Sequence, residues 1–147
     1  MIEADAIIVG GGPAGTSCAR ELTAAGWHTV ILDKADFPRN KLCAGWITPR
    51  VFRLLGLPPE EYPHTLTRFK TLHFRLKGFP LAVPTRQYAI RRFEFDRWLL
   101  ERSGAVLYRH RVKEIERSAE RFVVDGLYTA PVLVGAGGTQ CPVARSF

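Results

Sequence analysis

The chain has 147 residues, of which 46% are hydrophobic and 24% are charged, and these proportions are ordinary for a soluble globular protein. The length is sufficient for one domain with a real hydrophobic core, and it is equally compatible with part of a larger protein. No run approaches the roughly 18 apolar residues of a membrane span. Glu3 and Asp5 precede the first apolar run, where a secretion signal would carry positive charge. We therefore expect neither a transmembrane segment nor a signal peptide, and a cytoplasmic location.

Cysteine usage and net charge limit the partners further. Cys18, Cys43 and Cys141 are odd in number and lack C-x-x-C spacing, so neither a disulfide framework nor a metal site is indicated. The net charge of +7 raises nucleic acid or an anionic membrane surface as partners. The basic residues are scattered and usually mixed with acidic or aromatic ones. We expect no specific nucleic-acid partner, and leave peripheral membrane contact and the oligomeric state open.

The most informative stretch is the apolar run 6–9 followed by glycines at positions 10, 12 and 15. Gly10, Gly12 and Gly15 fit the pattern G-x-G-x-x-G, in which a buried strand gives way to a helix whose N-terminus receives a pyrophosphate. The first glycine permits the tight turn, the second lets phosphate oxygens approach the backbone, and the third lets helix and strand pack closely. The helix's first N–H groups then face the negative charge.

The residues after the glycines support this interpretation. An apolar helical pattern runs to Ala25, Gly26 supplies a stop, and residues 29–32 form a second apolar run that ends at Asp33. Asp33 follows Gly15 by 18 residues (33 − 15), close to where such a unit places the acid that accepts hydrogen bonds from a ribose. The alternative is a glycine-rich turn that binds nothing.

The remainder of the chain departs from a simple βαβ continuation. An irregular segment, 35–46, is followed by a short helix ending at Leu55, which Thr48 could cap. Strict alternation over 71–76 predicts a strand with one buried and one solvated face. The further expected elements are a turn at 77–78, an extended edge segment at 81–90, a helix over 91–102 with Gly104 as its stop, a strand at 105–108, a small meander at 112–115 and 122–124, and a final buried strand at 132–134.

Four sequence blocks carry a family resemblance, in one order along nearly the whole chain. They are 10–15 with Asp33, 38–45, the R-x-x-F-D arrangement of Arg92, Phe95 and Asp96, and 135–145. With these blocks the chain resembles the N-terminal part of a flavoprotein of the geranylgeranyl reductase family, within the p-hydroxybenzoate hydroxylase-like class of FAD-dependent oxidoreductases. This resemblance implies an α/β Rossmann-like FAD-binding fold with a parallel sheet, a small β-meander and an inserted antiparallel β segment.

The resemblance also implies a set of site residues. The cofactor-binding residues would be Gly10, Gly12, Pro13, Ala14, Gly15, Asp33, Lys34, Arg39, Lys41, Cys43, Ala44, Gly45, Trp46, Arg92, Val112, Ala136 and Gly137. The main chain near Val112 would lie by the adenine. A guanidinium at Arg92 suits phosphate or ribose oxygens, although a surface arginine at a helix start is the alternative. Cys43, beside Arg39 and Lys41, is either reactive toward the flavin or a small residue that fits its place.

The implied function is a FAD-dependent oxidoreductase acting on a hydrophobic substrate. Reduction of an isoprenoid double bond and oxygenation both stay open, with NAD(P)H as a candidate external electron donor. We find no catalytic triad or H-E-x-x-H motif and name no catalytic residue; the histidines and Cys18 and Cys141 are interpreted as surface or structural.

Two departures from the family pattern matter. Gly137 stands where many relatives have an acid, and the family's later G-D block is absent, so we expect a truncated, inactive protein. The predicted domains are 1–60, the FAD-binding βαβ unit and flavin loop; 61–91, a partial substrate-domain β insertion; and 92–147, the continuation of the FAD-binding domain. A non-catalytic nucleotide-binding module is the main alternative, and a basic nucleic-acid binder is the other.

Overall fold

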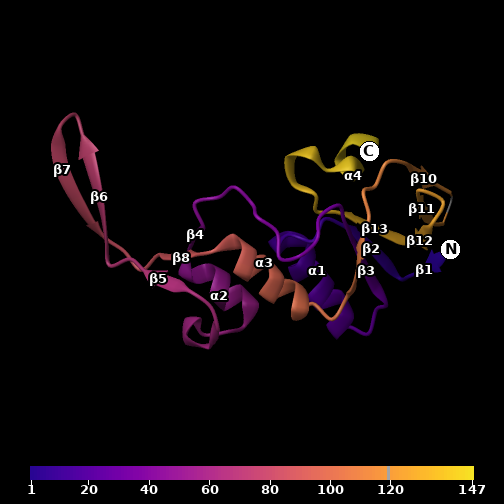
Figure 1. Cartoon of the computed structure of the whole chain (residues 1–147), viewed down its shortest axis with the longest axis horizontal. Helices are drawn as coiled ribbons and strands as arrows, with labels where there is room; N and C mark the ends of the chain where they lie inside the picture. Colours follow the sequence, from indigo (N-terminus) through magenta and orange to yellow (C-terminus); the bar gives the residue numbers. More distant parts are fainter. Residues whose placement is uncertain (119) are drawn as a thin grey trace. The chain divides into compact units, whose positions relative to one another are not determined.

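The computed structural model describes residues 1–118 and 120–147, and the chain divides into two compact units (Figure 1). Unit 1 comprises residues 1–39 and 96–147, and unit 2 comprises residues 40–95. The second unit is therefore an insertion in the sequence of the first. The three ranges predicted from the sequence, 1–60, 61–91 and 92–147, stay a prediction. The division into compact units does not show which segment binds the cofactor and which binds the substrate.

Unit 1 is built on a parallel sheet of four strands in the order β13-β2-β3-β9. The strands are β2 (Ala6–Val9), β3 (Thr29–Asp33), β9 (Val106–Arg109) and β13 (Val132–Gly135). Every residue of β2 is buried, and its apolar side chains alternate between two covered faces. The parallel sheet expected from the apolar runs is confirmed, and its strand ends gather at one edge.

Each face of this sheet is covered by a different layer. Helix α1 (Pro13–Ala24) covers one face, where Ile8 and Ile31 pack with Ala19. On the other face, Ile7 and Val30 pack with Val124 of a second sheet. That sheet has the order β1-β12-β11-β10, with β1 (Ile2–Glu3), β10 (Ile115–Arg117), β11 (Phe122–Val124) and β12 (Tyr128–Ala130).

The meander differs from its prediction at one end. The sequence predicts a strand over 112–115, whereas β10 begins only at Ile115. The backbone N–H groups of Lys113 and Glu114 donate to the carboxylate of Asp125, at 3.2 and 2.8 Å, instead of to a neighbouring strand. Because the Asp125 side chain accepts hydrogen bonds from these two consecutive amides, the strand begins later in the sequence than predicted. Apolar periodicity contains no information about such an acceptor.

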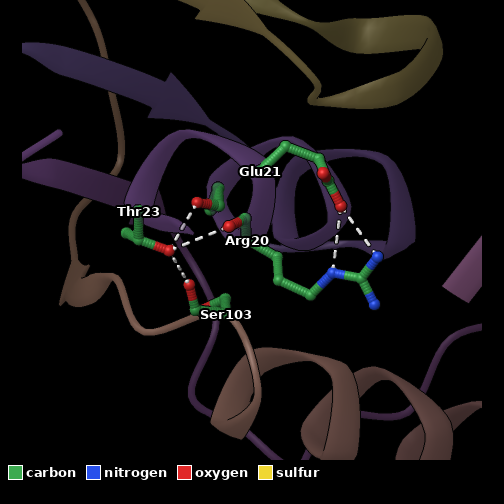
Figure 2. Close-up of polar contacts among 5 residues, drawn as sticks. Arg20, Glu21, Thr23 and Ser103 are labelled. Carbon is green, nitrogen blue, oxygen red and sulfur yellow. Dashed lines mark hydrogen bonds and ion pairs between the residues drawn. The ribbon is translucent and has the colours of Figure 1, made fainter. Parts of the chain in front are cut away.

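Helix α3 (Arg92–Glu101) is followed by a short link, residues 102–105, that leads into β9. The Thr23 hydroxyl of α1 lies 2.6 Å from the carbonyl oxygen of buried Ser103 and is also close to the carbonyl oxygens one turn back in α1 (Figure 2). Gly104 follows with a φ of +68°, a conformation that favours glycine and ends the helical segment. The loop before β9 is thereby anchored to α1. The chain closes with a 3-10 turn (Gly138–Gln140) and α4 (Pro142–Ser146).

Unit 2 contains a helix, a small sheet and a separate β-ribbon. Helix α2 (Pro49–Leu55) begins after Thr48, but the Thr48 side chain makes no capping hydrogen bond among the described residues. Phe52 of α2 is buried in edge-to-face contact with Tyr62 and Tyr88. The remaining elements are β4 (Trp46–Ile47), a 3-10 turn (Pro59–Glu61), β5 (Leu66–Arg68), β6 (Thr71–Leu76), β7 (Phe79–Pro84) and β8 (Tyr88–Ile90).

Two expectations for this unit are wrong. The extended segment 81–90 is two strands in two sheets, since β7 pairs with β6 whereas β8 pairs with β4 and β5. The strand over 71–76 exists, with its turn at 77–78, but its alternating apolar residues do not face a core. Only Leu72 in β6 is even partly buried, because no described element covers the ribbon.

The first testable prediction concerns the Asp125 carboxylate. Burial raises its pKa, but hydrogen bonds from His110 and from the amides of Glu114 and Lys113 outweigh burial and hold the pKa below its ordinary value of 3.8. A depressed carboxyl pKa stabilises the fold above the unfolded-state pKa, and this contribution is lost as pH falls through the folded-state pKa. Asp125→Asn should lower the free energy of unfolding at pH 7 by about 1.5–3 kcal/mol.

The difference between parent and variant should shrink below about pH 4. Asp36→Asn is the matched control, because Asp36 pairs with Arg109 at 3.0 Å where both side chains are about two-thirds exposed. Exposed ion pairs of this kind contribute little to the free energy of unfolding. Urea unfolding at several pH values measures both variants, and equal losses for Asp125→Asn and Asp36→Asn at pH 7 would contradict the prediction.

Candidate nucleotide-binding site

Gly10 and Gly15 are glycines because the backbone passes too close for a side chain. Gly10 has a φ of +113°, and a Cβ there would lie 2.5 Å from the carbonyl oxygen of Ala136. A Cβ on Gly15 would overlap the carbonyl oxygen of Gly10. These contacts agree with the turn and packing roles expected for the first and third glycines. Ala136 and Gly137, predicted from the resemblance, therefore lie directly against the turn that contains Gly10.

Gly12 differs, because the nearest group to a Cβ there is a flexible side chain. Within 4 Å such a Cβ would meet only Arg39 Nη2, at 3.4 Å, in the described part of the chain. Gly12 is the N-cap of α1, and Pro13 occupies the first turn. Among the described residues no side chain caps this helix and its first turn contains no acid. The N–H groups at the start of α1, including those of Ala14 and Gly15, thus suit an anion.

Arg39 stands beside this helix start with an unsatisfied donor. Its guanidinium lies over the Phe37 ring, 5.0 Å from the centroid, and its Nη2 is 3.6 Å from a carboxylate oxygen of fully buried Asp96. Its Nε is buried with no hydrogen-bond partner among the described residues. The guanidinium atom nearest to Gly12 is Nη2, so a phosphate oxygen at the helix start could accept a charge-assisted hydrogen bond from this end of Arg39. The glycines, α1 and Arg39 together fit a pyrophosphate.

Asp33 is held in place at the end of β3. The backbone N–H of Gly11 donates to one carboxylate oxygen at 2.8 Å, and that of Ala35 donates to the other at 2.9 Å. An ionised carboxylate has about four acceptor positions, so capacity is left for two ribose hydroxyls. The Asp33 carboxylate also connects the glycine turn to β3. This connection fixes the distance between the start of α1 and the end of β3.

A cavity of about 240 Å³ opens at this edge of the sheet. It is lined by Val9, Gly10, Leu32, Asp33, Lys34, His110, Arg111, Val112, Gly137, Gln140, Pro142 and Arg145. Five of the predicted site residues thus share one cavity, whereas His110, Arg111, Gln140 and Arg145 were missed. His110 and Arg111 follow β9 directly, so the rule that ligands sit at the carboxyl ends of parallel strands could have indicated them.

His110 is fixed by the meander sheet. Its Nε2 lies 2.6 Å from a carboxylate oxygen of Asp125, and its ring packs on Tyr128 at a centroid distance of 5.1 Å. Burial, with smaller effects from Tyr108 and Asp125, raises the pKa of Tyr128. His110 is thus a structural residue with a side-chain partner, which is one of the two interpretations offered from the sequence. This contact joins the segment after β9 to the turn between β11 and β12, and so positions His110 in the cavity wall.

The other predicted residues belong to unit 2. They are Lys41, Cys43, Ala44 and Trp46, which are exposed, Gly45, which is buried, and Arg92, which is half-buried. Gly45 has a φ of +70°, and a Cβ there would overlap the carbonyl oxygen of Ile90. Its backbone N–H donates to Cys43 Sγ at 3.4 Å. Packing thus explains Gly45, and a role of these six residues toward a cofactor stays a prediction.

Fold and site together define a Rossmann-type dinucleotide-binding protein. Residues 5–93 match the family model described as FAD dependent oxidoreductase, so the chain belongs to this family. The cofactor of the family is FAD, which confirms the cofactor predicted from the sequence.

Similar proteins agree with this assignment. Geranylgeranyl diphosphate reductase of Rhodobacter capsulatus is 32% identical over 68% of this chain and 25% of its own length. Digeranylgeranylglycerophospholipid reductase 2 of Methanopyrus kandleri is 27% identical over 99% of this chain and 40% of its own length. The chain thus spans less than half the length of these curated relatives, and the family resemblance seen in the sequence is confirmed.

Solved structures confirm the fold class. The chain is similar to PqsL of Pseudomonas aeruginosa in complex with 2-aminobenzoylacetate, with a TM-score of 0.81, 19% identity, and coverage of 97% of this chain and 45% of that one. None of the helices in the described part of the chain has both the length and the apolar character needed to cross a bilayer.

Two alanine substitutions should separate binding from folding at the glycine turn. Gly12→Ala should leave the thermal unfolding midpoint nearly unchanged and weaken FAD binding at least about tenfold, because the methyl occupies the space where phosphate oxygens approach. Gly15→Ala should lower the midpoint as well, because its methyl overlaps backbone of the turn. Calorimetry and FAD titration measure both. If Gly12→Ala bound FAD as tightly as the parent, the pyrophosphate would have to lie elsewhere.

Proposed function

We propose that this chain binds FAD through unit 1 and serves as the FAD-binding part of an oxidoreductase. The observation that carries the proposal is the space beside Gly12. The N-terminus of α1 has no side-chain cap, and Arg39 Nη2 lies 3.4 Å from where a Cβ on Gly12 would stand. Helix N–H groups and a guanidinium side by side suit the two phosphates of a dinucleotide.

Specific roles follow for the residues around that space. The pyrophosphate would lie on Gly10–Gly15 and the first turn of α1, with Arg39 donating to a phosphate oxygen. Asp33 would accept hydrogen bonds from the adenosine ribose, and Val112 would lie along the adenine in the cavity. Asp96 supports this arrangement by holding the Arg39 guanidinium in place.

Bound FAD would supply the redox chemistry of the site. The part of this chain is to hold and orient the cofactor, and the positive end of α1 together with Arg39 balances the pyrophosphate charge. In unit 2, residues 41–46 and Arg92 are proposed to face the cofactor, on the strength of the family resemblance. The names of the relatives support a hydrophobic, isoprenoid-like substrate, with oxygenation and NAD(P)H as electron donor left as open proposals. A cytoplasmic location stays a prediction.

The phosphate role of Arg39 can be tested with ligands of different length. Arg39→Lys keeps a charge beside Asp96 but lacks the guanidinium fork and its Nε donor. We expect affinity for FAD and ADP to fall about tenfold and affinity for adenosine to stay unchanged, because only the first two contain phosphate. The parent chain should bind FAD more tightly than NAD⁺.

Arg102→Lys is the matched control, because Arg102 also lies over an aromatic ring of unit 1, that of Trp98, but is exposed. Isothermal titration with the three ligands should leave this control equal to the parent. An equal loss of adenosine and ADP binding in Arg39→Lys would refute a phosphate contact. Tighter NAD⁺ than FAD binding by the parent would refute the cofactor assignment for this chain.

The 147-residue chain by itself should bind FAD weakly and show no turnover. The residues assigned above contact the adenosine and pyrophosphate, whereas catalysis requires a closed site around the flavin ring that excludes water. Steady-state NAD(P)H oxidation with added FAD measures this, with Gly12→Ala as a control for background. Robust turnover that Gly12→Ala abolishes would show that residues 1–147 suffice for the reaction.

A further inference from the structure

The segment that follows β9 forms one wall of the nucleotide cavity. His110, Arg111 and Val112 all line the cavity. In the described part of the chain, the main-chain N–H and C=O groups of Arg111 and Val112 have no backbone hydrogen-bond partner. Backbone groups of this kind need partners wherever water is excluded, so a ligand that fills the cavity has a donor and an acceptor to pair with here.

A single carboxylate, that of Asp125, holds this segment at both of its ends. At the first end, His110 Nε2 lies 2.6 Å from a carboxylate oxygen of Asp125. At the other end, the backbone N–H groups of Lys113 and Glu114 donate to the same carboxylate at 3.2 and 2.8 Å. We call these contacts the clamp. It closes a short loop whose middle residues, 111–112, lie in the cavity wall.

The clamp is itself anchored within unit 1. The backbone N–H of Asp125 donates to the carbonyl oxygen of Glu114 at 3.1 Å, and that of His110 donates to the carbonyl oxygen of Asp33 at 2.7 Å. The side chains of Asp125 and His110 are only 13% and 20% exposed, so little water competes for their contact. The wall is thus joined to the strand end that carries the proposed ribose acceptor.

We propose that Asp125 is a positioning residue for nucleotide binding, because the clamp holds residues 111–112 in the form that receives the adenine. This inference rests on the proposed function, in which Val112 lies along the adenine. Asp125 does not itself line the cavity, so it acts through the wall. Residues that hold a binding segment in its bound form reduce the entropy that is lost on binding.

A fixed wall should also distinguish between bases. The edge of adenine presents an acceptor at N1 and a donor at its amino group, whereas guanine presents a donor at N1 and an acceptor at O6. A backbone N–H and C=O held in fixed directions therefore match one base and leave unpaired groups against the other. If the clamp is released, the wall can adapt to either base, and the preference for adenine should decrease.

Isothermal titration of the 147-residue chain with adenosine, ADP, GDP and inorganic pyrophosphate tests the proposal. Asp125→Asn replaces one acceptor oxygen of the clamp by a donor. Its affinity for adenosine and ADP should fall about fivefold, and the preference for ADP over GDP should fall by a similar factor. Affinity for pyrophosphate should stay unchanged, because its proposed contacts are the glycine turn and Arg39. A general loss of stability would not produce this difference between ligands.

Two further variants and a control make the test sharper. Asp125→Ala removes every acceptor of the clamp and should have the larger effect, while His110→Phe keeps a ring beside Tyr128 but removes Nε2. The losses of adenosine affinity in Asp125→Asn and His110→Phe should combine to less than their sum in the double variant, because both release the same clamp.

Thr129→Val is the matched control, because it removes a buried hydroxyl of the same sheet that accepts from Arg121 Nε at 3.1 Å. Thr129 does not line the cavity, so all four affinities should equal those of the parent. Circular dichroism checks that every variant is folded at the temperature of the titration.

The outcomes separate this inference from the proposed function. If the parent binds ADP and both Asp125 variants bind adenosine and ADP equally well, the clamp contributes to stability alone and FAD binding by unit 1 still stands. The inference is also overturned if Asp125→Asn loses pyrophosphate and adenosine affinity to the same extent, or if its preference for ADP over GDP is that of the parent. A parent that binds neither ADP nor pyrophosphate would refute the proposed function, and this inference with it.

Discussion

The close approach of backbone at Gly10 is the constraint on which the candidate site depends. At this point the end of β2 turns against Ala136, while the start of α1 passes the Gly10 carbonyl at Gly15. No side chain fits into either contact, so the helix N-terminus is brought directly over the sheet edge. The Asp33 carboxylate then fixes the turn to β3 through the amide of Gly11. The uncapped N–H groups at the start of α1 and the Asp33 carboxylate therefore have a defined separation.

Sequence reasoning succeeds where structure follows from local pattern. The glycines at 10 and 15, the apolar runs of β2 and β3, and the acid at position 33 lie within one short stretch, and each is explained by its neighbours in the chain. The match of this stretch to a dinucleotide-binding unit predicts the parallel sheet and half of the site. The unsatisfied Nε of Arg39 could not be predicted in this way, because its burial depends on Phe37 and Asp96 together.

The errors arise where a residue's partner is distant or absent. Periodicity in 71–76 correctly indicates an amphipathic strand, but it contains no information about what lies against the apolar side. Similarly, 112–114 has the composition of a strand, and only the side chain of Asp125, more than ten residues away, shows why its amides bond elsewhere. The cavity residues His110 and Arg145 come from segments whose proximity is a property of the strand order β13-β2-β3-β9.

That strand order has a consequence for biosynthesis. Gly10 and the Ala136 carbonyl that it packs against are separated by 126 residues (136 − 10), and β2 needs β13 as its neighbour. The glycine turn cannot reach its final form until β13 has been translated and has paired with β2. Contacts between such distant residues form late in folding and leave earlier elements exposed in the meantime. The final geometry of this turn therefore depends on a long-range strand pairing, between β2 and β13, and not on the glycine segment alone.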